Sequence, residues 1–313
     1  MIKNMHLSVS ASIFYMLLSL SPASADFDLG MKAYIAKNYN LALRELTASA
    51  KDGHSMAQGI VGLMYSRGHG VERSFDKAVY WLEKAAKQGE VGAQFQLGMK
   101  YYLKRPINPE HKVPMLYWLS KAAEKNHTLA QEMLGMALLD NAGVNGTTDE
   151  ALEWLARAGF GGSARAQEML GSIYRGGRIT KRNYVKAHDW YLMAAQQNLP
   201  ASQWTLGYMY IAGEGVKKDF LQAKYWINNA AENGHGEAQL TLGTFAFLGT
   251  SNTERNLVVA YKWYAIAYAF GVIEAQRMKS VVSGEMTKGD IAEAEGLADE
   301  WIKLHELENK ETK

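Results

Sequence analysis

One period governs this sequence, because two residue types recur every 36 or 37 residues along most of its 313 positions. Glutamine marks one position of the period and tryptophan marks another. They stand at Gln58, Gln94, Gln131, Gln167, Gln203, Gln239 and Gln276, and at Trp81, Trp118, Trp154, Trp190, Trp226 and Trp263. A repeat of this length is one supersecondary unit that cannot bury its apolar face alone, so neighbouring units must stack. The sequence therefore predicts a stacked repeat architecture.

Each unit contains two segments with helical spacing. Ala93, Leu97 and Tyr101 recur every four residues, which places them on one face of a first helix. Trp81 and Ala85 share a face of a second helix in the same way. Because every periodic tryptophan has an alanine four residues later, we predict that these rings lie in the core and do not form a ladder for stacking on sugars.

A glycine recurs inside the first helix of each unit, four residues after the glutamine. These glycines are Gly62, Gly98, Gly135, Gly171, Gly207 and Gly243. Glycine in a helix interior costs about 1 kcal/mol relative to alanine. Its recurrence therefore predicts that a neighbouring helix passes too close to leave room for a side chain.

Turn and cap residues separate the helices. Paired glycines between the two helices, as in residues 212–216, supply turn conformations with positive φ. We expect Asp76 and Asp219 to cap the second helix of their units at its start. Gly89 and Gly234 are expected to end it.

The unit at residues 201–234 carries Ala-Gln, Leu-Gly, Tyr, a Gly-x-Gly-Val loop, Ala, Trp and Ala-Ala in that order. It resembles the Sel1-like repeat, a relative of the tetratricopeptide repeat, and the resemblance covers about residues 56–276. The resemblance implies an antiparallel helix pair in each unit. The expected fold class is therefore all-α, a right-handed α-solenoid of about seven or eight helix pairs, in an exported bacterial member of the family.

The two ends of the chain differ from the repeats. Residues 1–25 have a basic start, an uncharged apolar stretch and a small-x-small cleavage signal, which is typical of a secretory signal peptide. We expect a mature periplasmic or secreted protein that begins near Asp26, with a solenoid over 26–308. It is expected to comprise an N-terminal cap repeat at 27–53, regular repeats at 56–276 and a C-terminal capping helix within 277–308. Residues 309–313 are expected to fray.

Composition excludes several classes of function. The 34 basic and 32 acidic residues are spread along the chain and give a net charge of +2, so no electrostatic footprint for nucleic acid or anionic lipid is present. Cysteine is absent, which excludes disulfides and thiolate metal sites. The eight histidines include no pair at metal-ligand spacing, so neither a metal nor another cofactor is predicted. His54, His127 and His235 share one place near the ends of repeats, where an imidazole can meet the last carbonyls of a helix.

No catalytic site is predicted. Ser74 and Lys77 have the spacing of the serine–lysine pair of penicillin-binding enzymes, but the companion motifs Ser-Asp-Asn and Lys-Thr-Gly are missing. The Gly-x-Gly turns lack the third glycine and the lysine of a phosphate-binding loop. The chain is therefore predicted not to be an enzyme.

Two aromatic residues lie off the core positions of the repeat, Trp204 three residues before Gly207 and Tyr208 one residue after it. In tetratricopeptide-type solenoids these offsets line the concave groove, and aromatic side chains there are typical of binding hot spots. Packing against a neighbouring first helix is the alternative. Carrying the groove offsets to the other units gives the candidate partner-binding residues, which are Phe95, Met99, Tyr102, Glu132, Met136, Glu168, Arg175, Trp204 and Tyr208.

The resemblance implies a scaffold that binds a protein or peptide in its groove, with a role in host interaction among the known roles of exported members. We expect a monomer with no nucleic-acid partner and no membrane insertion once the signal peptide is removed. One alternative is a factor for envelope or exopolysaccharide assembly. Another is a cell-wall enzyme that binds β-lactams or peptidoglycan, as suggested by cysteine-rich relatives, but the absence of cysteine weakens that analogy.

Overall fold

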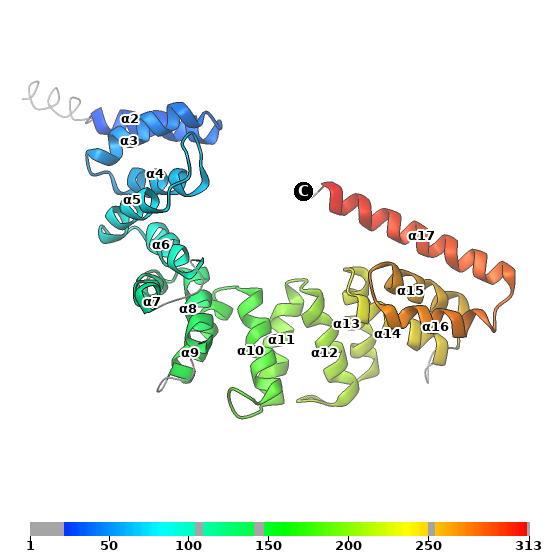
Figure 1. The fold of residues 1–313 in the computed structure, drawn as a ribbon. Helices are drawn as coiled ribbons and strands as arrows, with labels where there is room; N and C mark the ends of the chain where they lie inside the picture. Colours follow the sequence, from blue (N-terminus) through cyan, green and yellow to red (C-terminus); the bar gives the residue numbers. More distant parts are fainter. Residues whose placement is uncertain (1–21, 104–108, 141–146, 250–253, 312–313) are drawn as a thin grey trace, which may run out of the picture. The chain divides into compact units, whose positions relative to one another are not determined.

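The computed structural model describes residues 22–103, 109–140, 147–249 and 254–311, and within these residues it contains sixteen α-helices and no strand (Figure 1). They are α2 (Pro22–Ile35), α3 (Tyr39–Lys51), α4 (Ser55–Arg67), α5 (Phe75–Lys87), α6 (Val91–Leu103), α7 (Pro109–Glu124), α8 (Thr128–Asp140), α9 (Thr147–Phe160), α10 (Ala164–Gly176), α11 (Tyr184–Gln196), α12 (Pro200–Ala212), α13 (Phe220–Glu232), α14 (Gly236–Leu248), α15 (Leu257–Ala269), α16 (Ile273–Ser283) and α17 (Lys288–Glu311). Helices α2 to α15 form seven consecutive pairs, whereas α16 and α17 both pack on α15.

The helices belong to two compact units, residues 1–157 and 158–313. In the first unit α4 packs on α5, α5 on α6, α6 on α7 and α7 on α8; in the second unit the same chain of contacts runs from α10 to α15. Within these two stretches, each of α5, α7, α11 and α13 thus lies between its own first helix and the first helix of the next pair. This arrangement confirms the predicted all-α repeat solenoid.

The recurring glycines are contact points between the two helices of a pair, as predicted. A Cβ atom added to Gly207 would lie 2.6 Å from Cγ1 of Ile227, and one added to Gly98 would lie 2.8 Å from Cγ of Leu119. The neighbour is always the residue that follows the tryptophan of the same unit. In the six repeats, the residues that contact the glycine are Leu82, Leu119, Leu155, Tyr191, Ile227 and Tyr264.

Six of the seven recurring glutamines join their helix pair to the one before it, whereas Gln276 is exposed. Gln203 Nε2 donates a hydrogen bond to the carbonyl oxygen of Ala195, eight residues earlier, in the last turn of α11. The same bond is made by Gln58, Gln94, Gln131, Gln167 and Gln239, with N···O distances between 2.7 and 3.1 Å. A carbonyl at a helix end lacks an intrahelical partner. Each of these carbonyls also accepts a hydrogen bond from the backbone N–H three residues later, so the periodic glutamine supplies a second donor, from the next pair.

A second layer of bonds caps several of these glutamines. Gln88, at the end of α5, donates to Oε1 of Gln58, and Asn233, at the end of α13, donates to Oε1 of Gln203. Lys125 takes the corresponding place at the end of α7, and its Nζ donates to the carbonyl of Gly89 instead. Oε1 of Gln94 is consequently buried without a hydrogen-bond partner.

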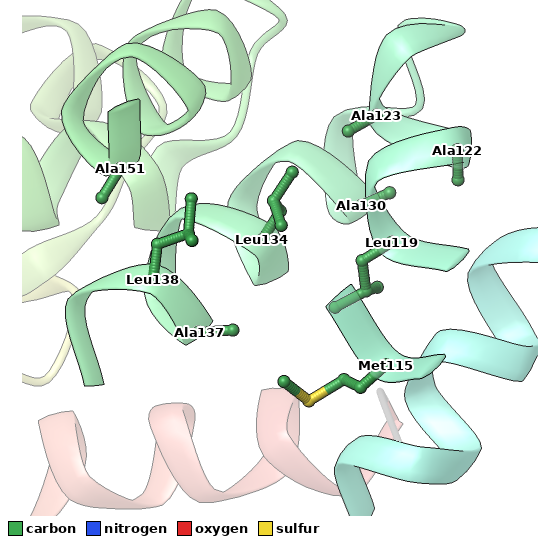
Figure 2. Packing of buried hydrophobic residues seen from close by; sticks show 9 residues of the cluster. All are labelled: Met115, Leu119, Ala122, Ala123, Ala130, Leu134, Ala137, Leu138 and Ala151. Carbon is green, nitrogen blue, oxygen red and sulfur yellow. The ribbon is translucent and has the colours of Figure 1, made fainter. Parts of the chain in front are cut away.

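The apolar core runs through the stack as a series of clusters. In the first unit, Leu119, Leu134 and Leu138 belong to one cluster of α7, α8 and α9 that also contains five alanines (Figure 2). Five periodic tryptophans are buried as predicted, namely Trp81, Trp118, Trp190, Trp226 and Trp263. Trp154 is half-buried, and its indole N–H donates to the Glu150 carboxylate.

The predicted helix ends are correct at three of four positions. Asp219 caps α13 by accepting hydrogen bonds from two backbone N–H groups, and Gly89 and Gly234 adopt positive φ after their helices. Asp76 does not cap α5, because the helix begins one residue earlier and Ser74 Oγ accepts the hydrogen bond from the Lys77 N–H.

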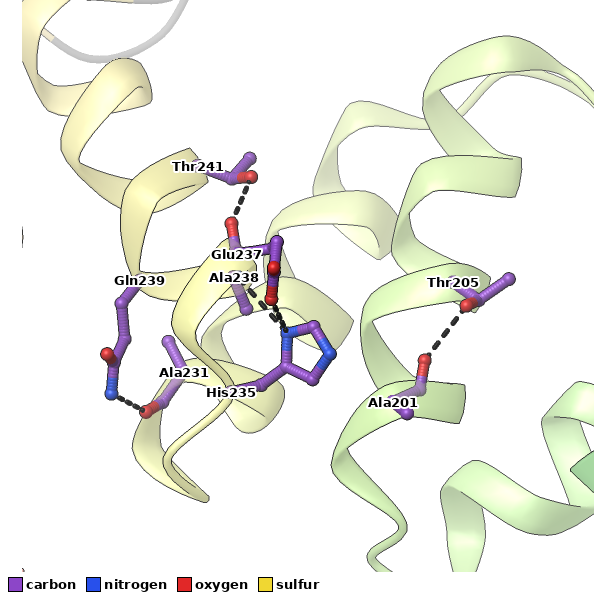
Figure 3. A network of polar contacts seen from close by, with 8 residues as sticks. All are labelled: Ala201, Thr205, Ala231, His235, Glu237, Ala238, Gln239 and Thr241. Atoms are coloured by element: carbon purple, nitrogen blue, oxygen red, sulfur yellow. Dashed lines mark hydrogen bonds and ion pairs between the residues drawn. The ribbon is translucent and has the colours of Figure 1, made fainter. Parts of the chain in front are cut away.

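The three periodic histidines cap the start of the following helix, so the prediction that they meet the last carbonyls of the preceding one was wrong. Nδ1 of His235 accepts a hydrogen bond from the Ala238 N–H at 3.3 Å (Figure 3). His54 and His127 accept the equivalent bond. Because Nδ1 accepts, the ring proton must lie on Nε2. Burial lowers the pKa of both His127 and His235, which favours this neutral form.

The C-terminal helices complete the second unit. Helix α17 packs against α15, where Trp301 contacts the rings of Trp263 and Phe270, and the Trp301 indole donates to the Glu232 carboxylate at 2.8 Å. Helix α17 extends to Glu311, three residues beyond the boundary expected from the sequence. Residues 1–21 of the predicted signal peptide lie outside the described residues. Across the described part of the chain, no helix has the length and apolar character needed for a membrane span.

Candidate partner-binding site

The first unit holds five of the candidate groove residues, and packing accounts for several of them. Phe95 stacks on His127 with ring centroids 4.5 Å apart and packs against the core cluster, as does Tyr102. Glu132 is only 4% exposed, so its side chain is not available on the surface. Met99 and Met136 are half-buried. These side chains do not form a continuous exposed patch.

The second unit brings the remaining candidates close together. Trp204 and Tyr208 lie one turn apart on α12 with ring centroids 6.4 Å apart. Trp204 is half-buried, packs against the core cluster and stacks on His235 at 5.3 Å. Tyr208 is 43% exposed. The structure therefore supports a packing role for Trp204 and leaves Tyr208 as the accessible aromatic ring.

Arg175, at the end of α10, faces the Tyr208 ring. Its guanidinium carbon lies 5.2 Å from the ring centroid, which is a cation–π distance. Its Nε donates to Oε2 of Glu214 at 2.7 Å. Burial alone would lower the pKa of Arg175, but the hydrogen bond and charge of Glu214 outweigh burial and raise it. The guanidinium is thus held in place from one edge by Glu214 and from one face by Tyr208.

A polar recess of about 290 Å³ lies beside this ion pair. Arg175 and Glu214 line it together with Ser172, Gly176, Tyr184 and Tyr191. Burial raises the pKa of Tyr191, so its hydroxyl stays protonated and can donate a hydrogen bond at neutral pH. The charge of Glu168, another candidate, acts on Tyr191 in the same direction. The recess therefore offers both donors and acceptors for a polar group.

Glu214 was not among the residues predicted from the sequence, because it stands between the two loop glycines and was assigned only to a turn. The second loop glycine, Gly215, lies against the backbone of Tyr184 in the preceding repeat, with no room for a side chain. This contact aims residue 214 at the preceding repeat. The sequence carried one signal for this role, a charged residue enclosed by two glycines. In the structure both glycines have positive φ.

The first unit contains the same construction with different side chains. Gly70 closes on the backbone of Tyr39, and His69, between the loop glycines, stacks on the Tyr39 ring at 4.2 Å. Tyr34 takes the place that Arg175 has in the second unit, 6.0 Å from the same imidazole. The loop residue therefore contacts the preceding repeat in both units, while the chemistry of the contact differs.

The described residues hold no group of three or more histidine, aspartate and glutamate side chains placed to bind a metal ion. Ser74 and Lys77 do not form a catalytic pair, because the Ser74 hydroxyl caps α5 and the Lys77 ammonium lies 5.4 Å from the Tyr65 ring centroid. The geometry that remains is an exposed aromatic ring beside an ordered ion pair and a polar recess.

Stacked helix pairs, tied together by periodic glutamines and glycine contacts, define a class of α-solenoid that presents recognition surfaces between repeats. The Sel1 repeat family model matches residues 55–90, 116–127, 128–159, 164–199, 200–235 and 236–269. The chain therefore belongs to the Sel1 repeat family, as the sequence predicted.

Two solved structures show the same fold. A Sel1 repeat protein from Oxalobacter formigenes is 31% identical, with a TM-score of 0.60 over 77% of this chain and 96% of that one. A protective antigen of uropathogenic Escherichia coli, described as an SLR fold, is 25% identical, with a TM-score of 0.52 over 90% of this chain and 68% of that one. Sel1 repeat proteins generally mediate protein–protein interactions.

Proposed function

We propose that this protein is an exported, non-enzymatic scaffold that holds a protein or peptide partner at the site formed by Tyr208, Arg175 and Glu214. The observation that carries the proposal is the exposed Tyr208 ring, which faces an arginine already ordered by a carboxylate. Tyrosine and arginine are the residues most enriched in binding hot spots. Ordering them before binding reduces the conformational entropy that a partner must overcome.

A polypeptide fits this site better than a small metabolite does. The recess of about 290 Å³ falls at the low end of ligand pockets and is lined mainly by polar groups. The Arg175 and Glu214 side chains are 31% and 20% exposed, so both remain within reach of a partner. A backbone amide can donate to Glu214 and accept from Arg175, while an adjacent side chain packs on Tyr208.

Export and a role outside the cell are also part of the proposal. Their support is the basic, apolar and small-residue pattern of residues 1–25. The similarity to a protective antigen of uropathogenic Escherichia coli supports a surface or host-facing role. Cell fractionation with sequencing of the mature N-terminus tests this part. A chain that begins near Asp26 in the periplasm or medium is expected, and an uncleaved cytoplasmic chain would contradict export.

The binding site is tested by affinity capture from the native envelope fraction with three versions of the full chain. We compare the wild type, Tyr208→Ala combined with Arg175→Ala, and Tyr225→Ala. Tyr225 is a matched control, because it is a 57% exposed tyrosine of the same unit that lies outside the site. A partner captured by the wild type and Tyr225→Ala, but lost by the folded double variant, is the expected result. A partner that the double variant retains in full would refute this site.

A further inference from the structure

A tyrosine recurs in the first helix of most units, three residues after the periodic glycine. It stands at Tyr65, Tyr101, Tyr174 and Tyr210. The corresponding residue is Leu138 in the pair of α8 and α9, where it is buried in the core, and Ala246 in the pair of α14 and α15. Alanine also stands at this position in the N-terminal pair, at Ala33, where it is buried in the core. Among the pairs from α4 to α15, the side chain at this position is much smaller at Ala246 than elsewhere.

Tyr210 shows what the tyrosine does in a regular unit. Its ring packs against a cluster that includes Ala187 of α11 and Trp226 of α13, so it lies between two consecutive second helices. Its hydroxyl lies 3.2 Å from Nε2 of His188, on α11. The ring fills the space between the helices, and the hydroxyl meets a polar side chain at the edge.

A cavity of about 380 Å³ occupies the corresponding space beside Ala246. Its apolar wall is formed by Leu242 and Phe245 of α14 and by Val259 and Trp263 of α15. Polar side chains complete its lining, namely Lys224 and Asn228 of α13 with Glu254 and Asn256. The cavity thus has an apolar interior and polar groups along one side, as ligand pockets have.

We propose that this cavity is a binding site for the phenol ring of a tyrosine from a partner polypeptide. The same arrangement of three helices holds a half-buried tyrosine ring at Tyr210, so the space beside Ala246 can accommodate such a ring. Lys224 stands two residues before its tryptophan, which is the place of His188 in the preceding unit. It therefore offers a polar partner at the position where the Tyr210 hydroxyl finds one.

The surroundings of the cavity favour a polypeptide as the source of the ring. Phe220 lies 5.0 Å from Phe245 between ring centroids and is 39% exposed, and its neighbour Leu221 is 69% exposed. These side chains extend the apolar surface from the cavity to the outside, where the residues that flank an anchoring tyrosine can pack. An anchor side chain in a pocket with an apolar margin is a common form of interface hot spot. The cavity shares no residue with the Tyr208 site, so a test of one site does not depend on the outcome at the other.

The test is a titration of the full chain with N-acetyl-tyrosinamide, followed by calorimetry and by tryptophan fluorescence. Matched probes are N-acetyl-leucinamide, which lacks the ring, and p-cresol, which lacks the peptide groups. The central variant is Ala246→Tyr, which restores the residue found in four other units. We expect the wild type to bind one molecule of the tyrosine probe, and Ala246→Tyr to bind at least tenfold more weakly while melting at a higher temperature because its cavity is filled.

A second variant guards against misfolding of the first. Tyr210→Ala should open an equivalent cavity beside His188 and raise the stoichiometry from one probe to two, provided that circular dichroism shows a folded chain. Equal binding of the tyrosine probe by wild type and Ala246→Tyr would overturn the proposal. Equal binding of the leucine probe would overturn the preference for a ring, and much tighter binding of p-cresol than of the tyrosine probe would overturn the assignment to a polypeptide.

Discussion

The glycine contact at the centre of each repeat makes a sharp prediction about stability. Replacing Gly207 by alanine adds a Cβ atom 2.6 Å from Cγ1 of Ile227 and 3.0 Å from the carbonyl oxygen of Ala223. Neither neighbour can move easily. Ile227 is β-branched and therefore stiff at χ1, and the Ala223 carbonyl is part of the α13 backbone.

Two opposing effects set the magnitude. Alanine is favoured over glycine in a helix interior by about 1 kcal/mol, whereas adding atoms to a packed core costs about 1 to 3 kcal/mol. Because both neighbours are stiff, we take the upper part of that range. Gly207→Ala is then expected to lower the free energy of unfolding by about 2 kcal/mol, despite the gain in helix propensity.

Gly296, which lies in the same compact unit as Gly207, provides the matched control. It lies inside α17, is exposed, and a Cβ atom built on it would have no neighbour within 4 Å. Gly296→Ala should therefore raise the free energy of unfolding by up to about 1 kcal/mol. Urea unfolding followed by circular dichroism and tryptophan fluorescence measures both changes. A Gly207→Ala protein as stable as Gly296→Ala would refute the close-contact explanation of the periodic glycines.

Three further predictions concern the polar groups between repeats. Since burial lowers the pKa of His235 below its usual 6.5, the unfolded chain takes up the proton first as the pH falls. The contribution of neutral His235 to the free energy of unfolding should be fully present above pH 6.5 and decline below it. His235→Ser should reduce that decline in thermal melts between pH 7.5 and 5. Gln203→Leu removes one of the two hydrogen bonds to the Ala195 carbonyl and the acceptor of the Asn233 amide, and should cost about 0.5 to 1.5 kcal/mol in urea unfolding, whereas Gln222→Leu at an exposed position of α13 should change stability by less than about 0.5 kcal/mol. Lys125→Gln should offer a donor to the buried Oε1 of Gln94 and add about 0.5 to 1.5 kcal/mol; an unchanged urea midpoint would show that this oxygen is already satisfied.

The fold was predictable because the sequence states the same information many times. The glycine, glutamine and tryptophan positions each recur at a fixed period, so the prediction does not depend on a chance match in one repeat. The meaning of the glutamine was not predictable, because its partner is a backbone carbonyl and leaves no mark in the sequence. The histidines were misplaced for a related reason. Only three residues separate the end of one helix from the start of the next at each of these histidines, and helix boundaries are the least certain element of a prediction from sequence.

The candidate site was predictable only in part. Tyr208 and Arg175 followed from offsets within one repeat, and the structure brings them together. Glu214 belongs to the loop that closes against the preceding repeat, so its role depends on how two repeats stack. Trp204 was assigned to the groove or to packing with equal weight, and the deciding contact, its stack on His235, comes from the next unit. Contacts between repeats are therefore the level at which reasoning from one repeat fails.

The features proposed to bind partners lie where the repeats differ from one another. Positions shared by all units maintain the stack, since a change at the glycine or glutamine would disturb two neighbouring pairs at once. Positions that vary without disturbing the stack are free to acquire chemistry, as the loop residue does with His69 in one unit and Glu214 in another. Position 246 also varies without disturbing the stack. Alanine there, in place of the tyrosine of four other repeats, leaves a cavity while the surrounding helices keep their contacts. It follows that sites in a solenoid of this kind are best sought by aligning the chain with itself and examining each departure in the structure.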